Sequence, residues 1–343
     1  MFKIIGMTKL IWKLFKIVLT LLLAFLMYVV IGGVVPFLHH PDVSQTKKEA
    51  VESTQFYSDS VGPDRATIIE DNEEALKMRL RVIKDAQKTL ILSTFDFRSD
   101  DAGKDILAAL LNAADRGVKV EIFADGFNSI IQMENNDYFY ALSSNKNIKI
   151  IIYNQVNILI PWNGLGRMHD KYVIADDSLY ILGGRNTFGY FLGDYAGHKN
   201  YDRDVLVYNT GSKASSIYQI KDYYKKITSQ KCCSVFHCNE SLGEKNSVKK
   251  AEQELKNRYE SLENKYDKFL AENYDYKANT YETNKINLLS NPTSLYTKQP
   301  TVYYGLMYLA KNAKKEVKIH TPYIICNDYM YNELKNIKVP TTI

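Results

Sequence analysis

An uncharged run of 22 residues near the N-terminus, from Ile17 to Leu38, is the feature that most constrains this chain. Its length and apolar content suit one helix across a bilayer, which needs about 20 residues. Lysines without acidic residues precede the run, at positions Lys3, Lys9, Lys13 and Lys16. The positive-inside rule predicts a cytoplasmic N-terminus, a single-pass anchor in the cell membrane and an extracytoplasmic globular part. A cleaved signal peptide is the alternative, although no clean small-x-small site follows the run.

The rest of the chain has a balanced charge. The formal net charge is +5, and without the four N-terminal lysines there remain 40 basic against 39 acidic residues. A protein that binds nucleic acid nonspecifically usually carries a strong basic excess. The balance therefore argues against nucleic acid as a partner. It favours a membrane phospholipid, which an anchored domain meets in the plane of the lipid bilayer.

Helical and strand-like patterns alternate beyond the anchor and a polar linker. The hydrophobic content of 45% is enough for a sizeable core. Alternation of this kind predicts an α/β fold in which a mixed β-sheet is covered by helices on both faces. The expected helices cover 72–88, 106–114 and 137–143, and the expected strands cover 89–95, 118–124 and 148–153.

The segment from 166 to 186, GRMHDKYVIADDSLYILGGRN, places His169, Lys171 and Asp176 in the spacing H-x-K-x4-D. Side chains alternate along a strand, so His169 and Lys171 would share one face about 7 Å apart. One of them can attack phosphorus, and the other can hold a phosphate oxygen. Residues 172–175 and 179–182 would form the two strands of a hairpin that turns at Asp176-Asp177.

Polar and glycine residues follow the hairpin. Gly183 and Gly184 would let the backbone approach a ligand closely, and Asn186 could donate to a phosphate oxygen. An imidazole, with an ordinary pKa of about 6.5, can act as a neutral nucleophile near pH 7 when a carboxylate orients it. Asp204, in a strand-like run that follows Tyr201, is the candidate for that carboxylate. A short triplet also arises by chance, so the strand context and the glycine pair are needed to support the functional interpretation.

These residues resemble the phospholipase D superfamily, and within it the bacterial cardiolipin synthase-like branch, whose signature is H-x-K-x4-D followed by G-G-R-N. The similarity extends from about Asn72 to Asp328 and includes Thr94-Phe95-Asp96-Phe97 and Asp202-Arg203-Asp204-Val205. It implies a phospholipase D-like mixed sheet flanked by helices, preceded here by one transmembrane helix. No metal and no other cofactor is implied.

The resemblance also implies a role for each motif residue. His169 would form a phosphohistidine intermediate, and Asp204 would orient it. Asp176 would mainly organise the hairpin. The phosphate would be bound by Lys171, Asn186, Gly183 and Gly184.

Members of this family usually carry two such motifs, because one histidine attacks while the other protonates the leaving group. This sequence contains one. Residues 84–94 resemble residues 311–321, an offset of 227 residues that would put a second histidine beyond Ile343. His320 is an alternative acid, although no lysine stands two residues after it. The expected organisation is a stub and transmembrane helix at 1–38, a linker at 39–70, a first domain at 71–230, a connecting segment at 231–283 and an incomplete second domain at 284–343.

Three functions follow from the resemblance. The leading one is a membrane-anchored phosphatidyltransferase or phosphodiesterase of phospholipid metabolism. A nuclease of the same superfamily and a catalytically inactive remnant are the alternatives. A homodimer that joins two copies of His169 would restore a paired site, unless residues 284–343 cover the face that it needs.

Two further segments leave alternatives open. Residues 247–274 carry a heptad-like apolar stripe, which fits either a coiled-coil dimer or, preferably, an amphipathic helix that lies on its own domain. The cluster Cys232, Cys233, His237 and Cys238 lacks a C-x2-C pair, so the sequence predicts no metal there. In an extracytoplasmic domain Cys238 would pair with Cys232 or Cys233, whereas in the cytoplasm these residues would be free thiols.

Overall fold

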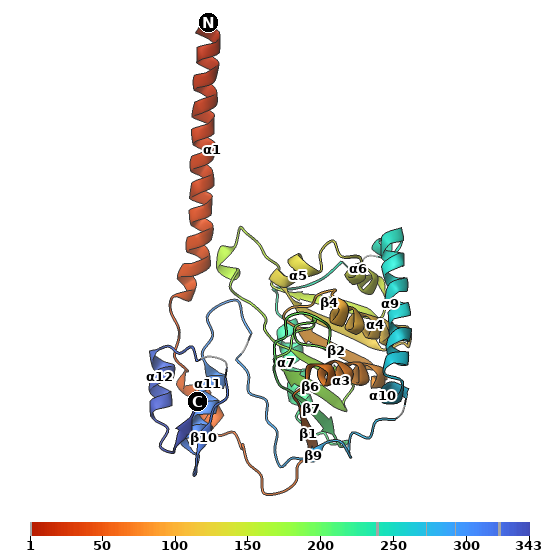
Figure 1. Ribbon diagram of the computed structural model, residues 1–343. Helices are drawn as coiled ribbons and strands as arrows, with labels where there is room; N and C mark the ends of the chain where they lie inside the picture. Colours follow the sequence, from red (N-terminus) through yellow and green to blue (C-terminus); the bar gives the residue numbers. More distant parts are fainter. Residues whose placement is uncertain (1, 238–239, 272, 292, 322–323) are drawn as a thin grey trace. The chain divides into compact units, whose positions relative to one another are not determined.

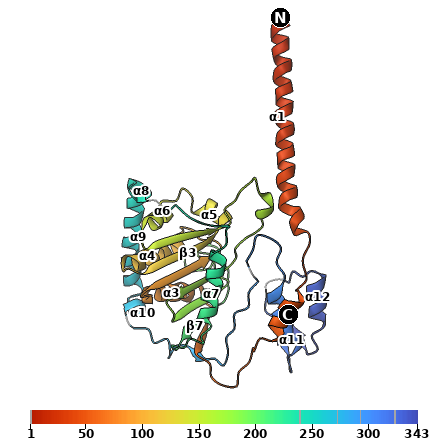
Figure 2. The same ribbon diagram turned by 180° about the vertical axis from the view of Figure 1, so that it is seen from behind.

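The computed structural model describes residues 2–237, 240–271, 273–291, 293–321 and 324–343. It divides into two compact units. The larger unit, Glu49–Gln155 with Met168–Ser290, contains a large sheet and the motif residues (Figures 1 and 2). The smaller unit comprises Met1–Lys48, Val156–Arg167 and Asn291–Ile343.

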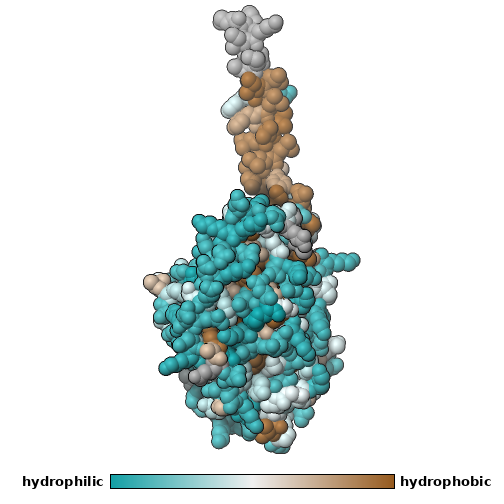
Figure 3. Space-filling model, turned by 90° about the vertical axis from the view of Figure 1, so that its right-hand side faces the viewer, coloured by the Kyte–Doolittle hydropathy of each residue, from teal (hydrophilic) through white to brown (hydrophobic). Residues whose placement is uncertain are grey.

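The N-terminal helix α1 spans Phe2–Val34 and continues into the 3-10 turn η1, Val35–Phe37. From Lys9 to Phe37 it is long and apolar enough to cross a membrane. From Leu10 to Val34 most of its large hydrophobic side chains are exposed, and Figure 3 shows mainly hydrophobic colour on the part of the helix that is not grey. The helix expected from the uncharged run is therefore present. Its orientation across a membrane stays a prediction.

Within the described residues, nine strands form one sheet in the order β8-β4-β3-β2-β5-β6-β7-β1-β9. Neighbours among β2, β3 and β4 are parallel, and every other neighbouring pair is antiparallel. This confirms the mixed sheet. The strands are β1 (Asp64–Ile69), β2 (Thr89–Thr94), β3 (Lys119–Asp125), β4 (Ile148–Tyr153), β5 (Tyr172–Ala175), β6 (Leu179–Gly183), β7 (Asp204–Asn209), β8 (Cys233–Val235) and β9 (Tyr281–Glu282).

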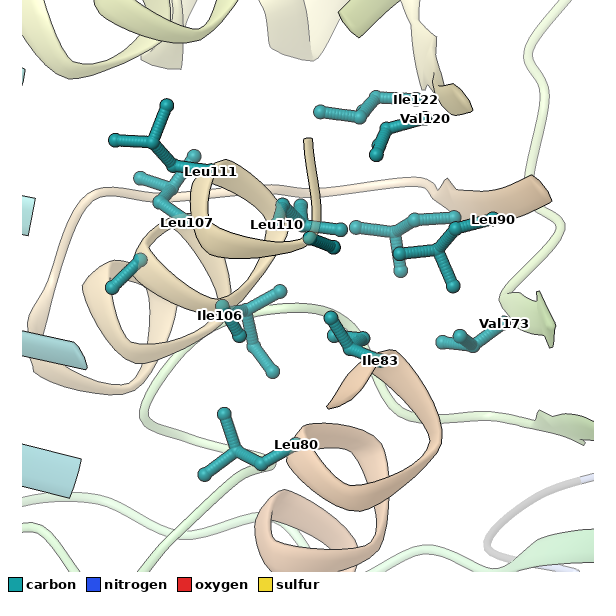
Figure 4. Close-up of a cluster of buried hydrophobic side chains, with 14 of the residues drawn as sticks. Leu80, Ile83, Leu90, Ile106, Leu107, Leu110, Leu111, Val120, Ile122 and Val173 are labelled. Atoms are coloured by element: carbon teal, nitrogen blue, oxygen red, sulfur yellow. The ribbon is translucent and has the colours of Figure 1, made fainter. Parts of the chain in front are cut away.

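Helices cover both faces of this sheet. On one face α3 and α4 bury apolar side chains against β2, β3 and β5, including Leu80, Leu110 and Val173 (Figure 4). On the other face Tyr224 of α7 contacts the rings of Phe123 and Tyr172 edge-on. The helices of this unit are α3 (Asn72–Asp85), α4 (Asp101–Asp115), α5 (Gly126–Gln132), α6 (Asp137–Ser144), α7 (Ile217–Thr228), α8 (Glu240–Gly243), α9 (Asn246–Lys265) and α10 (Asp267–Ala271), and α2 (Gln45–Glu52) precedes them across the division between the units.

The linker expected over residues 39–70 is wrong in its last part. Asp64–Ile69 forms strand β1, which pairs antiparallel with β7 along its whole length. Its side chains are mostly half-buried, and Arg65 donates to Thr280 and Glu282 near the short strand β9. A strand with so few buried apolar positions has a weak pattern in the sequence, and its partner is distant along the chain.

The stripe on α9 packs within its own unit. Leu255, Tyr259 and Leu262 are buried, and α9 lies against α4 and α6. Tyr266, which follows the helix, is buried as well. The stripe thus has a covering surface without a second chain. The amphipathic-helix interpretation is confirmed over the coiled coil.

The C-terminal segment has an element order like that of the first half. Helix α11 (Thr301–Lys311), strand β10 (Val317–Lys318), helix α12 (Asp328–Lys335) and strand β11 (Thr341–Thr342) follow one another, and the two strands are parallel. In the first half α3, β2, α4 and β3 do the same. Asp100 caps α4 and Asn327 caps α12, so the caps are also related by the offset of 227 residues. The extent of a second domain stays a prediction.

Candidate functional site

His169 and Lys171 lie immediately before β5, at one edge of the sheet. The ladder between β2 and β5 ends where Ser93 pairs with Tyr172, so the two motif residues precede the strand in which they were expected. The parallel strands β2, β3 and β4 all end at this edge. Loops from several strands therefore converge around the histidine, as they do around many α/β active sites.

The imidazole of His169 and the ammonium group of Lys171 are in contact. Lys171 Nζ lies 3.0 Å from His169 Nδ1 and donates to the His169 carbonyl oxygen at 2.8 Å. The ring of Phe95 lies 4.3 Å from the imidazole, measured between centroids. His169 is exposed, whereas Lys171 is only 5% exposed. An accessible nucleophile thus stands beside a largely desolvated cation.

Burial changes the acid-base behaviour of Lys171. Desolvation lowers the pKa of its ammonium group from 10.5 to about 8, and the charges of Asp170 and Asp202 only partly oppose this. Asp170 also accepts a hydrogen bond from the Tyr223 hydroxyl at 2.7 Å. Lys171 is therefore a cation at neutral pH that loses its proton more readily than a surface lysine does.

Asp125 fixes the position of the histidine loop. One carboxylate oxygen accepts from the backbone N–H groups of Phe127 and Asn128 at the start of α5. The other accepts from Met168 N at 3.1 Å, next to His169. Asn128 in turn donates to the Phe95 carbonyl oxygen at 2.7 Å. One buried carboxylate thus joins the end of β3, helix α5 and the motif segment.

Asn186 lies on the loop that follows β6, at the same edge. Its side-chain oxygen accepts from Asp96 N at 3.2 Å, and Thr187 N donates to the Asp96 carbonyl oxygen at 3.0 Å. These bonds tie the loop after β6 to the loop after β2. With its oxygen used in this way, the amide nitrogen of Asn186 is the group that can donate to a phosphate oxygen.

Gly183 and Gly184 allow close contact with the segment before β7. A Cβ atom on Gly183 would lie 1.8 Å from the Asp204 carboxylate, and one on Gly184 would lie 2.0 Å from the Asp202 carboxylate. Any side chain at either position would displace residues 202–204. This explains the glycine pair structurally. Its role in phosphate binding stays a prediction.

The expected bond between Asp204 and His169 is wrong. The Asp204 carboxylate is completely buried and accepts from Arg79 at 2.9 Å and from Arg185 at 3.1 Å, both on the same oxygen. Burial would raise the pKa of this carboxyl, but the two guanidinium groups outweigh it and hold the pKa below its ordinary value. Asp204 therefore belongs to a buried ionic cluster that holds β6, β7 and α3 together.

Asp176 lies at the other end of β5 from His169. Its two carboxylate oxygens accept from the backbone N–H groups of Gln87, Lys88 and Thr89 at 2.8–2.9 Å. It adopts a positive φ of 52° in the turn between β5 and β6. The structure does not bring it to the histidine, and these bonds fit the organising role in the hairpin that the resemblance implies. The two strands of the expected hairpin are present.

Three residues were not identified as candidates from the sequence: Arg185, Arg79 and Asp202. Arg185 stands within the G-G-R-N signature and is 1% exposed, but nothing in the signature shows that it faces inward. Arg79 comes from α3, and a charged residue on a helix normally suggests a solvated face. Asp202 precedes Asp204 by two positions, and its charge acts on Lys171. The extended segment at 202–204 carries two carboxylates, Asp202 and Asp204. Both could have been named as candidates for the carboxylate that orients His169.

The structure describes part of the cysteine cluster. Cys232 and Cys233 are free thiols in the structure, whereas Cys238 lies outside the described residues. The expected disulfide from Cys238 stays a prediction. Among the residues that the structure describes, no group of three or more His, Cys, Asp or Glu side chains is arranged to hold a metal ion.

Comparisons with known proteins place this domain among characterised sequences. Residues 80–227 match the family model described as "Cardiolipin synthase, PLD-like domain". Cardiolipin synthase B of Salmonella typhi is 32% identical over 142 residues, which cover 41% of this chain and 34% of that protein. A Helicobacter pylori protein described as uncharacterized is 28% identical over 295 residues, covering 79% of this chain and 56% of that protein. The chain thus spans about half or less of the length of these relatives.

A similar fold occurs in a solved structure. The phosphatidylserine synthase of Haemophilus influenzae Rd KW20 superimposes with a TM-score of 0.52, over 84% of this chain and 63% of that chain. The sequence identity is 11%. At this identity the match shows the arrangement of helices and strands and nothing about the substrate.

Proposed function

Because the chain belongs to the phospholipase D superfamily, with a cardiolipin synthase-like domain at residues 80–227, we propose that it is a membrane-anchored phosphatidyltransferase or phosphodiesterase. The observation that carries the proposal is the exposed imidazole of His169 beside the buried ammonium group of Lys171, 3.0 Å apart. The substrate is a phosphodiester of a membrane phospholipid. The globular part is proposed to face the extracytoplasmic side.

The reaction has two displacement steps at phosphorus. In the first, an imidazole nitrogen of His169 forms a bond to phosphorus, and the bond from phosphorus to the leaving alcohol breaks. In the second, the oxygen of an acceptor alcohol or of water attacks phosphorus, and the phosphorus–nitrogen bond breaks. Lys171 and Asn186 hold phosphate oxygens throughout. The proton for the leaving alcohol comes from a second group, which then takes the proton of the acceptor alcohol or water in the second step. A second copy of His169 in a homodimer is our candidate for this group.

Lys171 changes partner when substrate binds. A negatively charged phosphate oxygen is a stronger partner for the ammonium group than a neutral imidazole nitrogen, because the hydrogen bond is then assisted by both charges. Phosphate binding would thus draw Lys171 away from His169 Nδ1 and release the ring. We propose Asp202 in place of Asp204 as the carboxylate that orients the imidazole, since its charge acts on Lys171 and it lies against Gly184.

Two features support a lipid substrate over nucleic acid. The chain beyond the first four lysines is nearly neutral, and α1 is suited to hold the domain at a membrane. The inactive remnant remains the second candidate, because the sequence contains one H-x-K-x4-D motif where the family usually has two.

The test is a product assay on the full chain in vesicles that contain radiolabelled phosphatidylglycerol. We expect labelled cardiolipin if a lipid alcohol is the acceptor, and labelled phosphatidic acid if water is. Single-stranded DNA offered under the same conditions should stay intact. Cleavage of DNA with no lipid product would support the nuclease, and absence of any product would support the inactive remnant.

The depressed pKa of Lys171 predicts an early alkaline limit to activity. The lysine must be charged to hold phosphate, and its pKa is about 8. As the pH rises through that value the charged fraction falls, so kcat/KM should decline with an apparent pKa of about 8 rather than near 10.5.

The control is Lys171→Arg, which keeps its charge at every accessible pH. We expect lower activity in this variant, because the guanidinium group does not fit the position of the ammonium group, but without the decline near pH 8. The same alkaline limb in the arginine variant would assign the titration to another group.

A further inference from the structure

A loop with exposed apolar side chains leads directly into the motif segment. Residues 156–165, here called the apolar loop, follow β4 and include the 3-10 turn η2 (Pro161–Asn163). Ile158 and Leu159 are 59% and 65% exposed, and Val156 and Leu165 are also exposed. Scattered single apolar residues are common on surfaces, but four within ten positions form a patch that suits an apolar partner.

The apolar loop packs against the end of α1 that precedes the globular part. The Tyr28 hydroxyl donates to the Leu159 carbonyl oxygen at 2.9 Å, and the Tyr28 ring contacts Trp162 edge-on. A Cβ atom on Gly32 would lie 2.6 Å from the Pro161 ring, so the contact requires glycine in the helix. These contacts all lie within the smaller unit.

The position of this contact along α1 indicates how deep the apolar loop would lie in a bilayer. Gly32 precedes Leu38, the last residue of the uncharged run, by six positions, which is about 9 Å along a helix. Peripheral segments with an apolar face bury about 5–10 Å into the boundary between headgroups and acyl chains. Tyrosine and tryptophan are enriched at that level of the bilayer. With α1 in a bilayer, the tip of the apolar loop would lie at this boundary.

A second apolar element adjoins the histidine. Helix α5 exposes Phe127, Ile130 and Ile131 to between 46% and 57%. Asn128 on the same helix donates to the carbonyl oxygen of Phe95, whose ring lies on His169. α5 follows β3 and the apolar loop follows β4, and the two parallel strands end at the same edge of the sheet.

We propose that this edge of the sheet contacts the lipid bilayer, with the apolar loop and α5 inserted at the boundary between headgroups and acyl chains. His169 follows Leu165 by four positions, a reach of at most about 14 Å, so insertion of the loop keeps the histidine near the headgroups. A phospholipid would then present its phosphate to His169 without leaving the bilayer. The inference rests on the proposed function for its substrate class and adds the surface that delivers the substrate.

Tryptophan fluorescence tests the insertion without any need for turnover. The chain contains two tryptophans, so Trp12→Phe leaves Trp162 as the single reporter. The full chain is placed in vesicles of phosphatidylcholine and phosphatidylglycerol whose acyl chains are brominated near the glycerol end. We expect strong quenching of Trp162 by the brominated lipids and weak quenching by acrylamide in the aqueous phase. Strong acrylamide quenching without quenching by brominated lipids would overturn the proposal.

The same measurement extends to α5. In protein that lacks both native tryptophans, Phe127→Trp should be quenched by the brominated lipids. The matched control is Tyr281→Trp on β9, an exposed aromatic position outside both apolar elements, which should be quenched by acrylamide. Identical quenching at the two positions would contradict insertion by α5.

Polar substitutions then link insertion to turnover. Ile158→Asp with Leu159→Asp should reduce quenching of Trp162 and lower lipid turnover in vesicles on the order of tenfold, because charge is disfavoured at the boundary. Val61→Asp, at a position that is 60% exposed and outside both elements, should do neither. Equal effects of the two changes would contradict the proposal. Quenching should persist in a His169→Ala background, so strong quenching without turnover would count against the proposed function alone.

Discussion

Replacement of His169 by alanine is expected to abolish lipid turnover, with a loss on the order of 10⁴- to 10⁶-fold, because the proposed covalent step uses this imidazole as its nucleophile. A loss of this size corresponds to roughly 5–8 kcal/mol of transition-state stabilisation. The measurement is kcat/KM for phosphatidylglycerol in vesicles. In addition, the protein is isolated after reaction with radiolabelled substrate, and the label bound covalently to it is counted. The label on the wild-type protein should be removed by acid, as a phosphorus–nitrogen bond requires, and should be absent from the variant.

His198→Ala provides the matched control. His198 is also exposed, and its ring nitrogen lies 2.9 Å from the Asn200 side chain, outside the contacts of the motif residues. The variant should retain nearly full turnover. Equal losses in the two variants, or retained turnover in His169→Ala, would remove the phosphohistidine from the mechanism.

Replacement of Asp204 by alanine is expected to lower the free energy of unfolding by about 3–5 kcal/mol, since it leaves two buried guanidinium groups without their carboxylate. Arg79 and Arg185 both donate to one oxygen of Asp204, and all three side chains are at most 4% exposed. Thermal unfolding in detergent micelles, followed by circular dichroism, measures the loss. The companion variant is Glu70→Gln, which weakens an exposed pair with Arg203 and should cost no more than about 1 kcal/mol.

The same cluster gives stability a pH dependence of known sign. The folded-state pKa of Asp204 is below its ordinary value. The stabilisation is therefore complete above the unfolded-state pKa of about 4 and is lost as the pH falls through the folded-state pKa. A small loss of unfolding free energy in Asp204→Ala together with a large loss of activity would support the catalytic role first expected for Asp204.

The sequence was most informative where the chemistry is local. The proximity of His169 and Lys171 was expected from their spacing, although both precede β5 and lie in direct contact. The hairpin of β5 and β6 follows from two apolar runs around Asp176-Asp177. The helices α3, α4 and α6 and the parallel strands β2, β3 and β4 follow from strong periodic patterns, whereas the short helix α5 was not expected. In each case the residues that decide the structure are close together along the chain.

The sequence was less informative where the partner is distant. Arg79 and Asp204 are 125 positions apart, and the extended run around Asp204 does not show which of its carboxylates turns inward. β1 was missed because the strands that it pairs with, β7 and β9, are far along the chain and its own side chains are largely half-buried. Tertiary pairing decides such strands more than local preference does.

Strand β1 has a practical consequence for any attempt to shorten the chain from its N-terminus and remove helix α1. It fills the hydrogen-bonding side of β7, and its first residue, Asp64, is buried and accepts from Ser216 N. A truncation at residue 71, where the helical pattern begins, would strip this strand away and leave β7 with a row of unpaired amides and carbonyls beside Asp202. Unpaired edges of this kind promote aggregation. A shortened version of the protein without α1 should therefore start upstream of Asp64, even though the sequence there has the composition of a linker.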